Sequence, residues 1–209
     1  MAALMMTSCL KDDNTEETQQ EWEEWQKAVD TQRNAMVGDY NGKLYYYASV
    51  SSKQTDSLAV QWSAASDSVI VLKNIPLQQI VGTMLGNNID DLRDSIAKMG
   101  NVDLMAKVYV NYEYHSPIVM YAFPEPIVVK DVAVGGERVD AVISFDTYET
   151  STSNASYAKF MMTTGEMLVV LYPKEVFVGT IRKGYFSPQV ARMQWYGKRG
   201  SRPAITENK

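Results

Sequence analysis

The sequence has only one cysteine and one histidine in 209 residues, and these two shortages exclude several kinds of active site. A single cysteine, Cys9, cannot form an intramolecular disulfide. Ser-His-Asp and Cys-His sites need a histidine beside an oriented nucleophile. His115 is the only histidine, and the sequence contains no Gly-x-Ser-x-Gly motif that would supply a nucleophilic serine. A zinc site needs three or four His, Cys or carboxylate ligands. We therefore expect no metal ion and no catalytic role for His115.

Long apolar runs, phosphate-binding loops and an excess of positive charge are also missing. No stretch approaches the roughly 18 apolar residues of a membrane-spanning helix. Neither Gly-x-x-x-x-Gly-Lys-Ser/Thr nor Gly-x-Gly-x-x-Gly occurs, so we expect no nucleotide cofactor. The net charge of −5 argues against nucleic acid as a partner, because such binding depends on neutralising phosphates with Lys and Arg.

Charge is nevertheless divided between the two ends of the chain. Residues 11–24 carry one lysine and seven acidic residues, whereas residues 182–202 carry six basic residues and no acidic one. One interpretation is a pair of solvated ends that attract each other. The other is a C-terminal patch that contacts anionic lipid or polysaccharide.

A short apolar run ends in two small residues, Thr7 and Ser8, directly before Cys9. This arrangement resembles the bacterial lipoprotein signal, in which the cysteine thiol receives a diacylglycerol and becomes the first residue of the mature chain. Met6 stands where such signals usually have leucine, and the run is shorter than the usual stretch of about 7 to 15 residues. A start further upstream accounts for both departures. The resemblance implies that residues 1–9 are a truncated signal and that Cys9 carries the lipid.

The location implied by this signal is the cell envelope, as an outer-membrane lipoprotein held to the membrane by its lipid anchor. Lys11, Asp12 and Asp13 resemble the acidic tag that sends some Bacteroides-type lipoproteins to the cell surface. Acidic linkers also follow the cysteine of periplasmic lipoproteins, so the sequence does not decide between the periplasmic side of the outer membrane and the cell surface. The alternative is a cytosolic protein with an incidental cysteine.

The segment 10–37 is expected to be a tether followed by an N-terminal helix. The helix begins at Thr15, a suitable N-cap, and Gly38 ends it. Its apolar residues lie on one stripe at helical spacing: Trp22, Trp25, Val29 and Met36. We expect the two tryptophans to pack over the domain. The alternative is that they form a platform for carbohydrate.

From residue 38 the hydrophobic pattern changes to the alternation of β-strands. It predicts a single β-rich domain over 38–200 and a tail at 201–209. The expected strands are 44–50, 58–64, 68–73, 104–115, 118–123, 127–134, 137–148, 157–163, 166–172, 175–182 and 190–196. Within the second of these, Trp62 falls on the apolar face and is expected in the core.

Two helices are expected to interrupt these strands between residues 76 and 100. The first ends at Gly86, and the second is capped by Asn88 and ends at Gly100. Their apolar residues recur at helical spacing: Leu77, Ile80, Val81, Met84 and Leu85, then Ile89, Leu92, Ile96 and Met99. The predicted fold is mainly β (α+β), an antiparallel barrel or sandwich with an N-terminal helix and a helical hairpin packed on the sheet.

Gly135-Gly136 is a strong hairpin signal, because both glycines accept a positive φ. The turn pairs Val132 with Val139. The same register places Asp131 opposite Asp140, a like-charge pair that a neighbouring basic residue or a bound cation would screen.

The segment Gly38-Asp39-Tyr40-Asn41-Gly42, between a helix and a meander, resembles the opening of lipocalin-like and other calycin-like domains. The helical pair at 76–100 departs from a true lipocalin, which puts a simple ligand-filled barrel in doubt. The chain resembles more closely a family of uncharacterised Bacteroides lipoproteins, over roughly residues 36–196. That resemblance rests on three short segments with the patterns Gly-x-Tyr-x-Gly-Lys, Val-x-x-Pro-type and Tyr-x-Phe-Pro: Gly38–Lys43, Val71–Pro76 and Tyr121–Pro124. The family implies no established activity.

Paired carboxylates are the one kind of catalytic site that this composition permits, because a glycosidase needs only two, about 5 to 10 Å apart. The sequence does not select a pair. The acidic residues on or beside the expected strands are Glu113, Glu125, Asp131, Asp140, Asp146, Glu149 and Glu166.

Aromatic residues are the other candidates, with 13 tyrosines and 4 tryptophans. Exposed rings with polar tips suit stacking on sugars and contacts at interfaces, although ordinary strand preference explains many tyrosines equally well. The expected ligand-binding residues are Trp22, Trp25, Tyr45, Tyr47, Tyr112 and Tyr114.

We therefore expect a non-enzymatic, lipid-anchored envelope or surface protein with a binding or structural role. Its partner would be a glycan, a lipid or another envelope protein, and not a nucleic acid. The alternative is a glycan hydrolase that uses a carboxylate pair.

Overall fold

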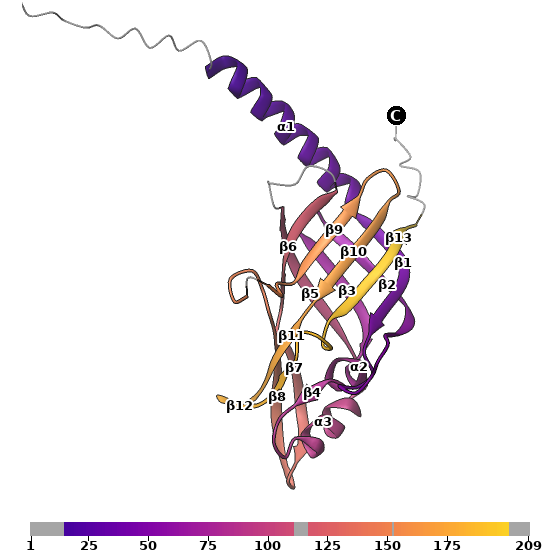
Figure 1. The fold of residues 1–209 in the computed structure, drawn as a ribbon, viewed down its shortest axis with the longest axis vertical. Helices are drawn as coiled ribbons and strands as arrows, with labels where there is room; N and C mark the ends of the chain where they lie inside the picture. The colour runs from indigo at the N-terminus through magenta and orange to yellow at the C-terminus, as the bar shows by residue number, and fades with distance from the viewer. Residues whose placement is uncertain (1–14, 111–116, 152, 201–209) are drawn as a thin grey trace, which may run out of the picture.

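A closed eight-stranded antiparallel barrel, continued at one end by a five-stranded sheet, forms the body of the protein (Figure 1). The structure is a computed structural model that describes residues 15–110, 117–151 and 153–200. This architecture confirms the mainly β prediction and decides between the two expected alternatives in favour of the barrel.

Every barrel strand has an antiparallel neighbour on both sides, because the ring closes. The order around the ring is β1 (Gly38–Tyr46), β13 (Met193–Arg199), β10 (Glu166–Leu171), β9 (Tyr157–Met161), β6 (Ile118–Pro124), β5 (Asn101–Val110), β3 (Val69–Pro76) and β2 (Asp56–Ser66).

The second sheet lies at the lower end of the barrel in Figure 1, beside two short helices, α2 (Leu77–Val81) and α3 (Asp90–Ala97). Buried residues of the barrel, the helices and this sheet form one hydrophobic core. The order of strands in the sheet is β4 (Met84–Leu85), β12 (Ile181–Phe186), β11 (Pro173–Val178), β8 (Glu137–Phe145) and β7 (Ile127–Val134).

Large side chains fill the inside of the barrel. Inward positions alternate with outward ones along each strand, and the inward side chains of Tyr40, Trp62, Phe160 and Trp195 are at most 1% exposed. Tyr40 stacks on Trp62, with ring centroids 5.5 Å apart. Trp62 therefore lies in the core as predicted, and the barrel interior around these rings is a packed core of the kind that small barrels form.

The N-terminal helix α1 (Thr15–Met36) has the predicted bounds to within one residue. Its last turn is fixed to the barrel: Arg33 Nη2 lies 2.7 Å from Asp67 Oδ2, Met36 is fully buried, and the hydroxyl of Tyr40 donates to the Met36 carbonyl at 2.5 Å. No helix in the described part of the chain is long and apolar enough to cross a membrane.

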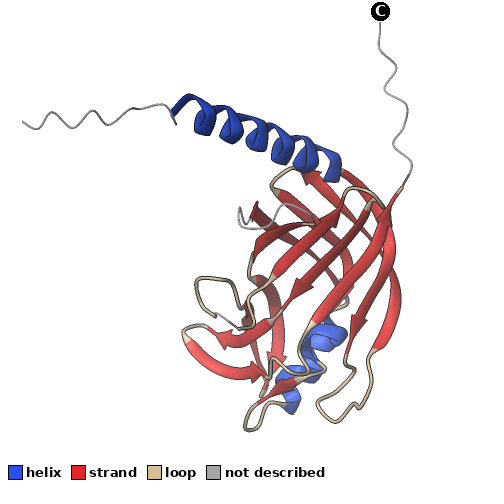
Figure 2. Ribbon diagram, turned by 45° about the horizontal axis from the view of Figure 1, so that its top comes forward, coloured by secondary structure: helices blue, strands red, loops and turns tan. Residues whose placement is uncertain are grey.

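The expected packing of Trp22 over the domain is wrong, whereas Trp25 is half-buried. Most of α1 projects away from the barrel (Figures 1 and 2), and Trp22 is 54% exposed. The physical reason is the sparse apolar stripe, of which only Val29 and Met36 are buried. A helix needs a broader apolar face than this to lie flat on a core.

The two predicted helices between residues 76 and 100 exist, but the first is shorter than expected. It ends at Val81 because Met84–Leu85 leaves the helical path and pairs with β12 as strand β4. Asn88 is not the cap of the second helix, since its φ is 55° and the N-cap is Ile89. Ser95 of α3 donates to the carbonyl of Ala133, which ties α3 to β7.

Ile80→Ala is expected to lower the free energy of unfolding by about 2 to 5 kcal/mol, because Ile80 is 1% exposed and its loss leaves a cavity in the core. Thermal or denaturant unfolding of the purified protein measures the change. Met99→Ala is the matched control, since Met99, which was predicted buried, is 43% exposed. An Ile80→Ala midpoint equal to that of the parent would show that α2 does not belong to the core.

The Gly135-Gly136 hairpin is confirmed, with φ values of 59° and 87° and Val132 paired with Val139. Asp131 lies across from Asp140 only as part of a bulge, because the register shifts between Val129 and Val132 and leaves Lys130 and Asp131 to share this one partner. Asp131 has a φ of 55°, and its backbone N–H donates to Asp140 Oδ1 at 3.3 Å. This bulge brings Lys130 Nζ to 2.5 Å from Asp140 Oδ2, so a lysine compensates the charge of Asp140. The predicted strand 175–182 is wrong, since a turn after Val178 divides it into β11 and β12.

Candidate functional site

An opening in the barrel wall lies where β2 and β3 separate. The two strands are paired from Ser66 opposite Val69 to Trp62 opposite Leu72, and no pairing continues beyond Trp62 toward the start of β2. We call this opening, of about 480 Å³, the β2–β3 hollow. Its lining residues are Asn41, Gly42, Ala59, Val60, Gln61, Lys73 and Asn74.

A distortion of β3 explains why the ladder stops here. The pairing of β3 with β5 shifts between Leu72 and Ile75, and Asn74 has a φ of 54°, in the left-handed region that asparagine adopts more easily than most residues. Asp103 Oδ1 accepts the backbone N–H of Asn74 at 2.8 Å and so holds this conformation. A bulge of this kind bends its strand, which takes β3 off the line needed for pairing with β2.

Gly42, at an inward position of β1, is among the residues that line the hollow. It faces Gly197 on β13. A Cβ atom on Gly42 would lie 2.2 Å from the carbonyl oxygen of Tyr196, and one on Gly197 would lie 2.6 Å from the Trp62 ring. The second glycine of the Gly-x-Tyr-x-Gly segment is thus required by the close approach of β1 and β13.

The polar groups that line the hollow are neutral amides and one ammonium group, and Ala59 and Val60 add apolar surface. Asn41 and Gln61 face each other across β1 and β2, and Gln61 Nε2 donates to Asn41 Oδ1 at 2.8 Å. This bond leaves the amide N–H groups of Asn41 and the carbonyl oxygen of Gln61 free to bind other groups. Lys73 adds a cation, and no carboxylate is among the described residues that line the hollow. Such a lining can donate to and accept from hydroxyl groups.

Tyrosines and lysines continue from the hollow along the outer barrel wall. Lys43 and Tyr45 on β1 point outward, because they alternate along the strand with the inward residues Leu44 and Tyr46. Tyr196 on β13 lies opposite Lys43 and is 42% exposed. Two strands further, β9 presents a second tyrosine and lysine in the same outward positions. We call this surface the tyrosine face, and its members are Lys43, Tyr45, Tyr157, Lys159 and Tyr196.

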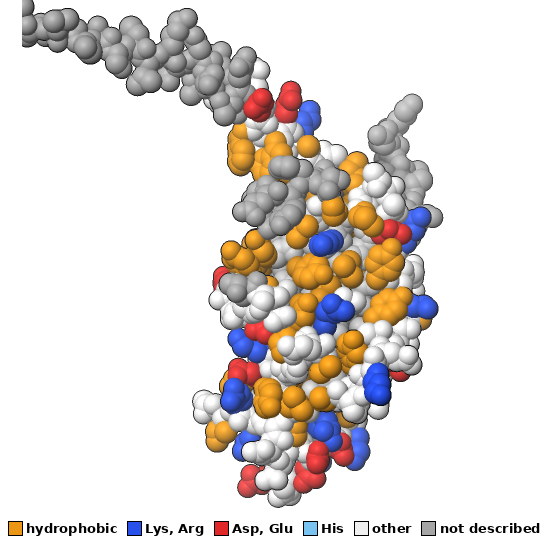
Figure 3. All heavy atoms as spheres, viewed as in Figure 1, with side chains coloured by type: hydrophobic (Ala, Val, Ile, Leu, Met, Phe, Trp, Pro, Cys, Tyr) orange, Lys and Arg blue, Asp and Glu red, His pale blue; other side chains and the backbone are white. Residues whose placement is uncertain are grey.

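Figure 3 looks onto this wall and shows hydrophobic side chains gathered over β9, β10 and β13, with separate Lys and Arg side chains between them. The strand register places Lys159, Leu168, Tyr196 and Lys43 in one row across four strands. A hydrogen bond to Glu166 raises the pKa of Tyr196. The Tyr196 hydroxyl donates its proton to the Glu166 carboxylate, and the phenol oxygen can still accept a hydrogen bond from a ligand.

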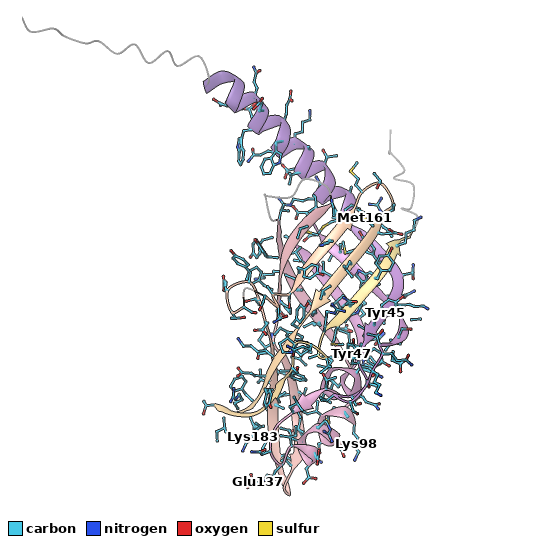
Figure 4. The ribbon with its side chains drawn as sticks, viewed as in Figure 1. Tyr45, Tyr47, Lys98, Glu137, Met161 and Lys183 are labelled. Carbon is cyan, nitrogen blue, oxygen red and sulfur yellow. The ribbon has the colours of Figure 1, made fainter. Side chains whose placement is uncertain are left out.

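The structure brings only part of the predicted aromatic set to this surface. Tyr45 belongs to the tyrosine face, and Tyr47 lies just beyond the end of β1 (Figure 4). Trp22 and Trp25 stack on each other, with centroids 4.7 Å apart, on α1 rather than on the barrel. The remaining predicted residues lie outside the described residues: Tyr112 and Tyr114, together with Cys9 and His115.

Tyr157 and Tyr196 were missed as candidates from the sequence. The run Trp195-Tyr196-Gly197 contains a usable signal, since a core tryptophan at one position places the next side chain outside. Nothing in the sequence shows that β13 and β10 lie between β1 and β9, so the assembly of these tyrosines with Lys43 could not be predicted.

The candidate carboxylates do not form a catalytic pair at this site. Asp140 is bound by Lys130, Asp146 Oδ1 lies 3.1 Å from Lys174, and Glu166 accepts from the Thr164 hydroxyl at 3.0 Å. Glu125 and Glu149 are exposed, and Glu113 lies outside the described residues. Over residues 15–110, 117–151 and 153–200, no three His, Cys, Asp or Glu side chains gather in a way that could hold a metal ion.

The basic residues near the C-terminus do not form one patch. Arg182 lies on the second sheet, where its Nη1 is 2.8 Å from Glu175 Oε1, whereas Lys198 and Arg199 lie on β13 of the barrel. The hypothesis of a single lipid-binding or polysaccharide-binding patch over residues 182–202 is therefore wrong in this form, because the fold divides the segment between two sheets.

Comparison with known proteins identifies the family of the chain but assigns no activity to it. No curated protein and no solved structure matches the chain significantly. A protein-family model matches residues 35–178, which include the segment from Gly38 to Gly42 and the β2–β3 hollow. Strand β13, which closes the barrel beside β1, lies beyond the matched range. Since the match covers more than half of the sequence, the chain belongs to the family described as a domain of unknown function, DUF4840.

Proposed function

We propose that the protein is a non-enzymatic, lipid-anchored envelope protein of the Bacteroides lipoprotein type, which binds a ligand at the β2–β3 hollow and the tyrosine face. The lipid attachment site is Cys9, and the calycin-like similarity extends to the barrel architecture alone. The observation that carries the binding role is the lining of the hollow, which offers amide groups and a lysine and contains no acid among the described residues.

Helix α1 supports the anchored arrangement. Its 22 residues span roughly 33 Å at about 1.5 Å per residue. Arg33, Met36 and Tyr40 fix its last turn to the barrel, while the remainder projects from it. A lipid at Cys9 would therefore hold the barrel away from the bilayer, with its outer wall open to large ligands.

A co-sedimentation assay tests the binding role directly. The full-length Cys9→Ser protein, which has no anchor, is mixed with envelope fragments from the organism that encodes it. We expect it to sediment with the fragments, and we expect Gln61→Ala and Lys73→Ala to weaken this about twofold to tenfold, since each removes one or two polar contacts. Lys183→Ala, on the second sheet, is the matched control (Figure 4). Equal sedimentation of all four proteins would refute the proposed site.

The alternative function, a glycan hydrolase, has one specific location in its favour. A second hollow, of about 530 Å³ at the lower end of the barrel, has both Asp56 and Asp94 in its lining. Arg93 Nε lies 3.7 Å from Asp94 Oδ1, and glycoside hydrolysis would need one of these two carboxyl groups as its acid. Release of reducing sugar ends from the same envelope fragments, abolished by Asp56→Asn or Asp94→Asn, would replace the binding function with this one.

A further inference from the structure

We infer that the ligand of the β2–β3 hollow and the tyrosine face is an anionic glycan, a polysaccharide chain whose sugars carry carboxylate, sulfate or phosphate groups. This inference rests on the proposed function and names the ligand class of the same site. It follows from the unpaired lysines, the exposed rings and the extent of the surface.

The lysines of this surface are not held by acidic partners, although Lys159 Nζ lies 5.4 Å from the centroid of the Tyr157 ring and makes a cation–π contact within the face. Lys43 and Lys159 have only uncharged cross-strand neighbours: Ala59 and Tyr196 for Lys43, Val119 and Leu168 for Lys159. Lys198 lies opposite Glu166, but that carboxylate is engaged by the hydroxyls of Thr164 and Tyr196. None of these lysines, nor Lys73, forms an ion pair with a described residue.

This accumulation of cations stands out because the chain as a whole has a net charge of −5. Elsewhere on the described surface, Arg33, Arg93, Lys130, Lys174 and Arg182 each have an acidic partner, whereas Lys53, Lys98, Lys107 and Lys183 form no ion pair with a described residue but do not lie together on one wall with exposed tyrosines. Lys43, Lys159 and Lys198 stand here against one carboxylate, Glu166, and a region with an excess of positive charge on a negatively charged protein attracts ligands of complementary charge. The occupant of the tyrosine face should therefore be anionic.

The rings and amides point to carbohydrate among anionic ligands. Tyr45 and Tyr196 lie beside Lys43 on the outer wall, and the negative face of an aromatic ring attracts the C–H groups of a sugar ring. Asn41 and Gln61 supply donors and acceptors for hydroxyls next to these rings. A protein partner would instead need large apolar anchors buried in pockets, and the side chains that line the hollow beside the tyrosines are amides, one lysine and the small apolar residues Ala59 and Val60.

The surface is long enough for a chain of several sugars. From the hollow on β2, the site continues across β1, β13 and β10 to Lys159 on β9. Four steps between adjacent strands, at about 4.8 Å each, extend over roughly 19 Å. A monosaccharide would touch only one part of this row, whereas a polysaccharide would contact the hollow, Tyr196 and Lys159 together.

Affinity electrophoresis of the full-length Cys9→Ser protein tests the inference with three probes: polygalacturonate and dextran sulfate as anionic polysaccharides, and dextran as the neutral one. We expect retardation in gels that contain an anionic polysaccharide, none with dextran, and loss of the retardation as salt rises, because exposed charge pairs are screened.

Lys43→Ala and Lys73→Ala should each raise the dissociation constant about twofold to fivefold, and Lys43→Arg should keep it near the parent value. Tyr196→Ala should raise it about twofold to tenfold, with Lys183→Ala unchanged.

Several results would overturn the inference. Dextran could retard the protein as much as the anionic polysaccharides do, without any effect of salt. If Gln61→Ala reduced this retardation, the binding site would remain in place but its ligand would be a neutral glycan. Binding of phosphatidylglycerol vesicles without any binding of polysaccharide would assign the lysines to a membrane surface. Retardation by none of the three polysaccharides would refute the anionic glycan, while the envelope co-sedimentation assay would still decide the proposed function separately.

Discussion

Cys9→Ser is expected to move the protein from the membrane fraction to the soluble fraction completely, with no change in its melting temperature. Stable membrane attachment takes more than one acyl chain, each buried CH₂ contributing about 0.8 kcal/mol, and a lipoprotein cysteine supplies at least two. Without the thiol no diacylglycerol is attached. Residues 11–24, with seven acidic residues against one lysine, would not bind an anionic bilayer by themselves. Fractionation of cells that express the two proteins, followed by immunoblotting, measures the shift.

The control for this prediction is Ser8→Ala, which keeps the cysteine and a small residue before it and should stay in the membrane fraction. Mass spectrometry of the parent protein should show an N-terminal Cys9 with acyl chains and no residues 1–8. If the Cys9→Ser protein remained with membranes, or the parent kept a free thiol behind an intact Met1, the anchor and the envelope location would both be refuted.

Trp62→Ala is expected to lower the free energy of unfolding by about 3 to 5 kcal/mol, the range for removing a buried aromatic ring. Trp62 is 1% exposed, stacks on Tyr40 and lies against Gly197. Its loss would open a cavity in the barrel core beside the β2–β3 hollow. Total stabilities of single domains are only about 5 to 15 kcal/mol, so this one change would remove a large fraction. Urea unfolding followed by circular dichroism gives the value.

Trp22→Ala provides the matched control, since it removes the same ring from a position that is 54% exposed. Its expected effect is within about 0.5 kcal/mol, as for most surface substitutions. A Trp62→Ala protein as stable as the Trp22→Ala protein would contradict a barrel with a filled core, and with it the conclusion that ligands bind on the wall rather than inside.

The elements of the fold follow from local sequence patterns wherever one physical signal dominates. The helix Thr15–Met36, the hairpin at Gly135-Gly136 and the core position of Trp62 each depend on residues close together in the chain. Where two signals compete, the local pattern fails. Met84 and Leu85 continue a helical stripe, but pairing with β12, about 100 residues later in the chain, makes them a strand.

The candidate site depends on relations that no local pattern contains. The hollow brings together Asn41, Gln61 and Lys73 because β2 separates from β3. The separation follows from a bulge at Asn74, whose backbone N–H is held by Asp103, 29 residues further along the chain. The tyrosine face requires β13 to insert between β1 and β10. Tyr45 was a candidate from exposure and residue type alone, and the same reasoning also selected Trp22 and Trp25, which the fold places on α1.

The most direct test of the proposed binding site is a nuclear magnetic resonance titration of ¹⁵N-labelled Cys9→Ser protein with polysaccharide released from its own envelope. The site predicts the largest shift changes at the backbone and side-chain amides of Asn41, Gln61 and Asn74, smaller ones along Tyr196 and Lys159, and none at Lys98 or Lys183. Shift changes confined to the second sheet and α3, or no change at saturating polysaccharide, would contradict a binding site at the β2–β3 hollow.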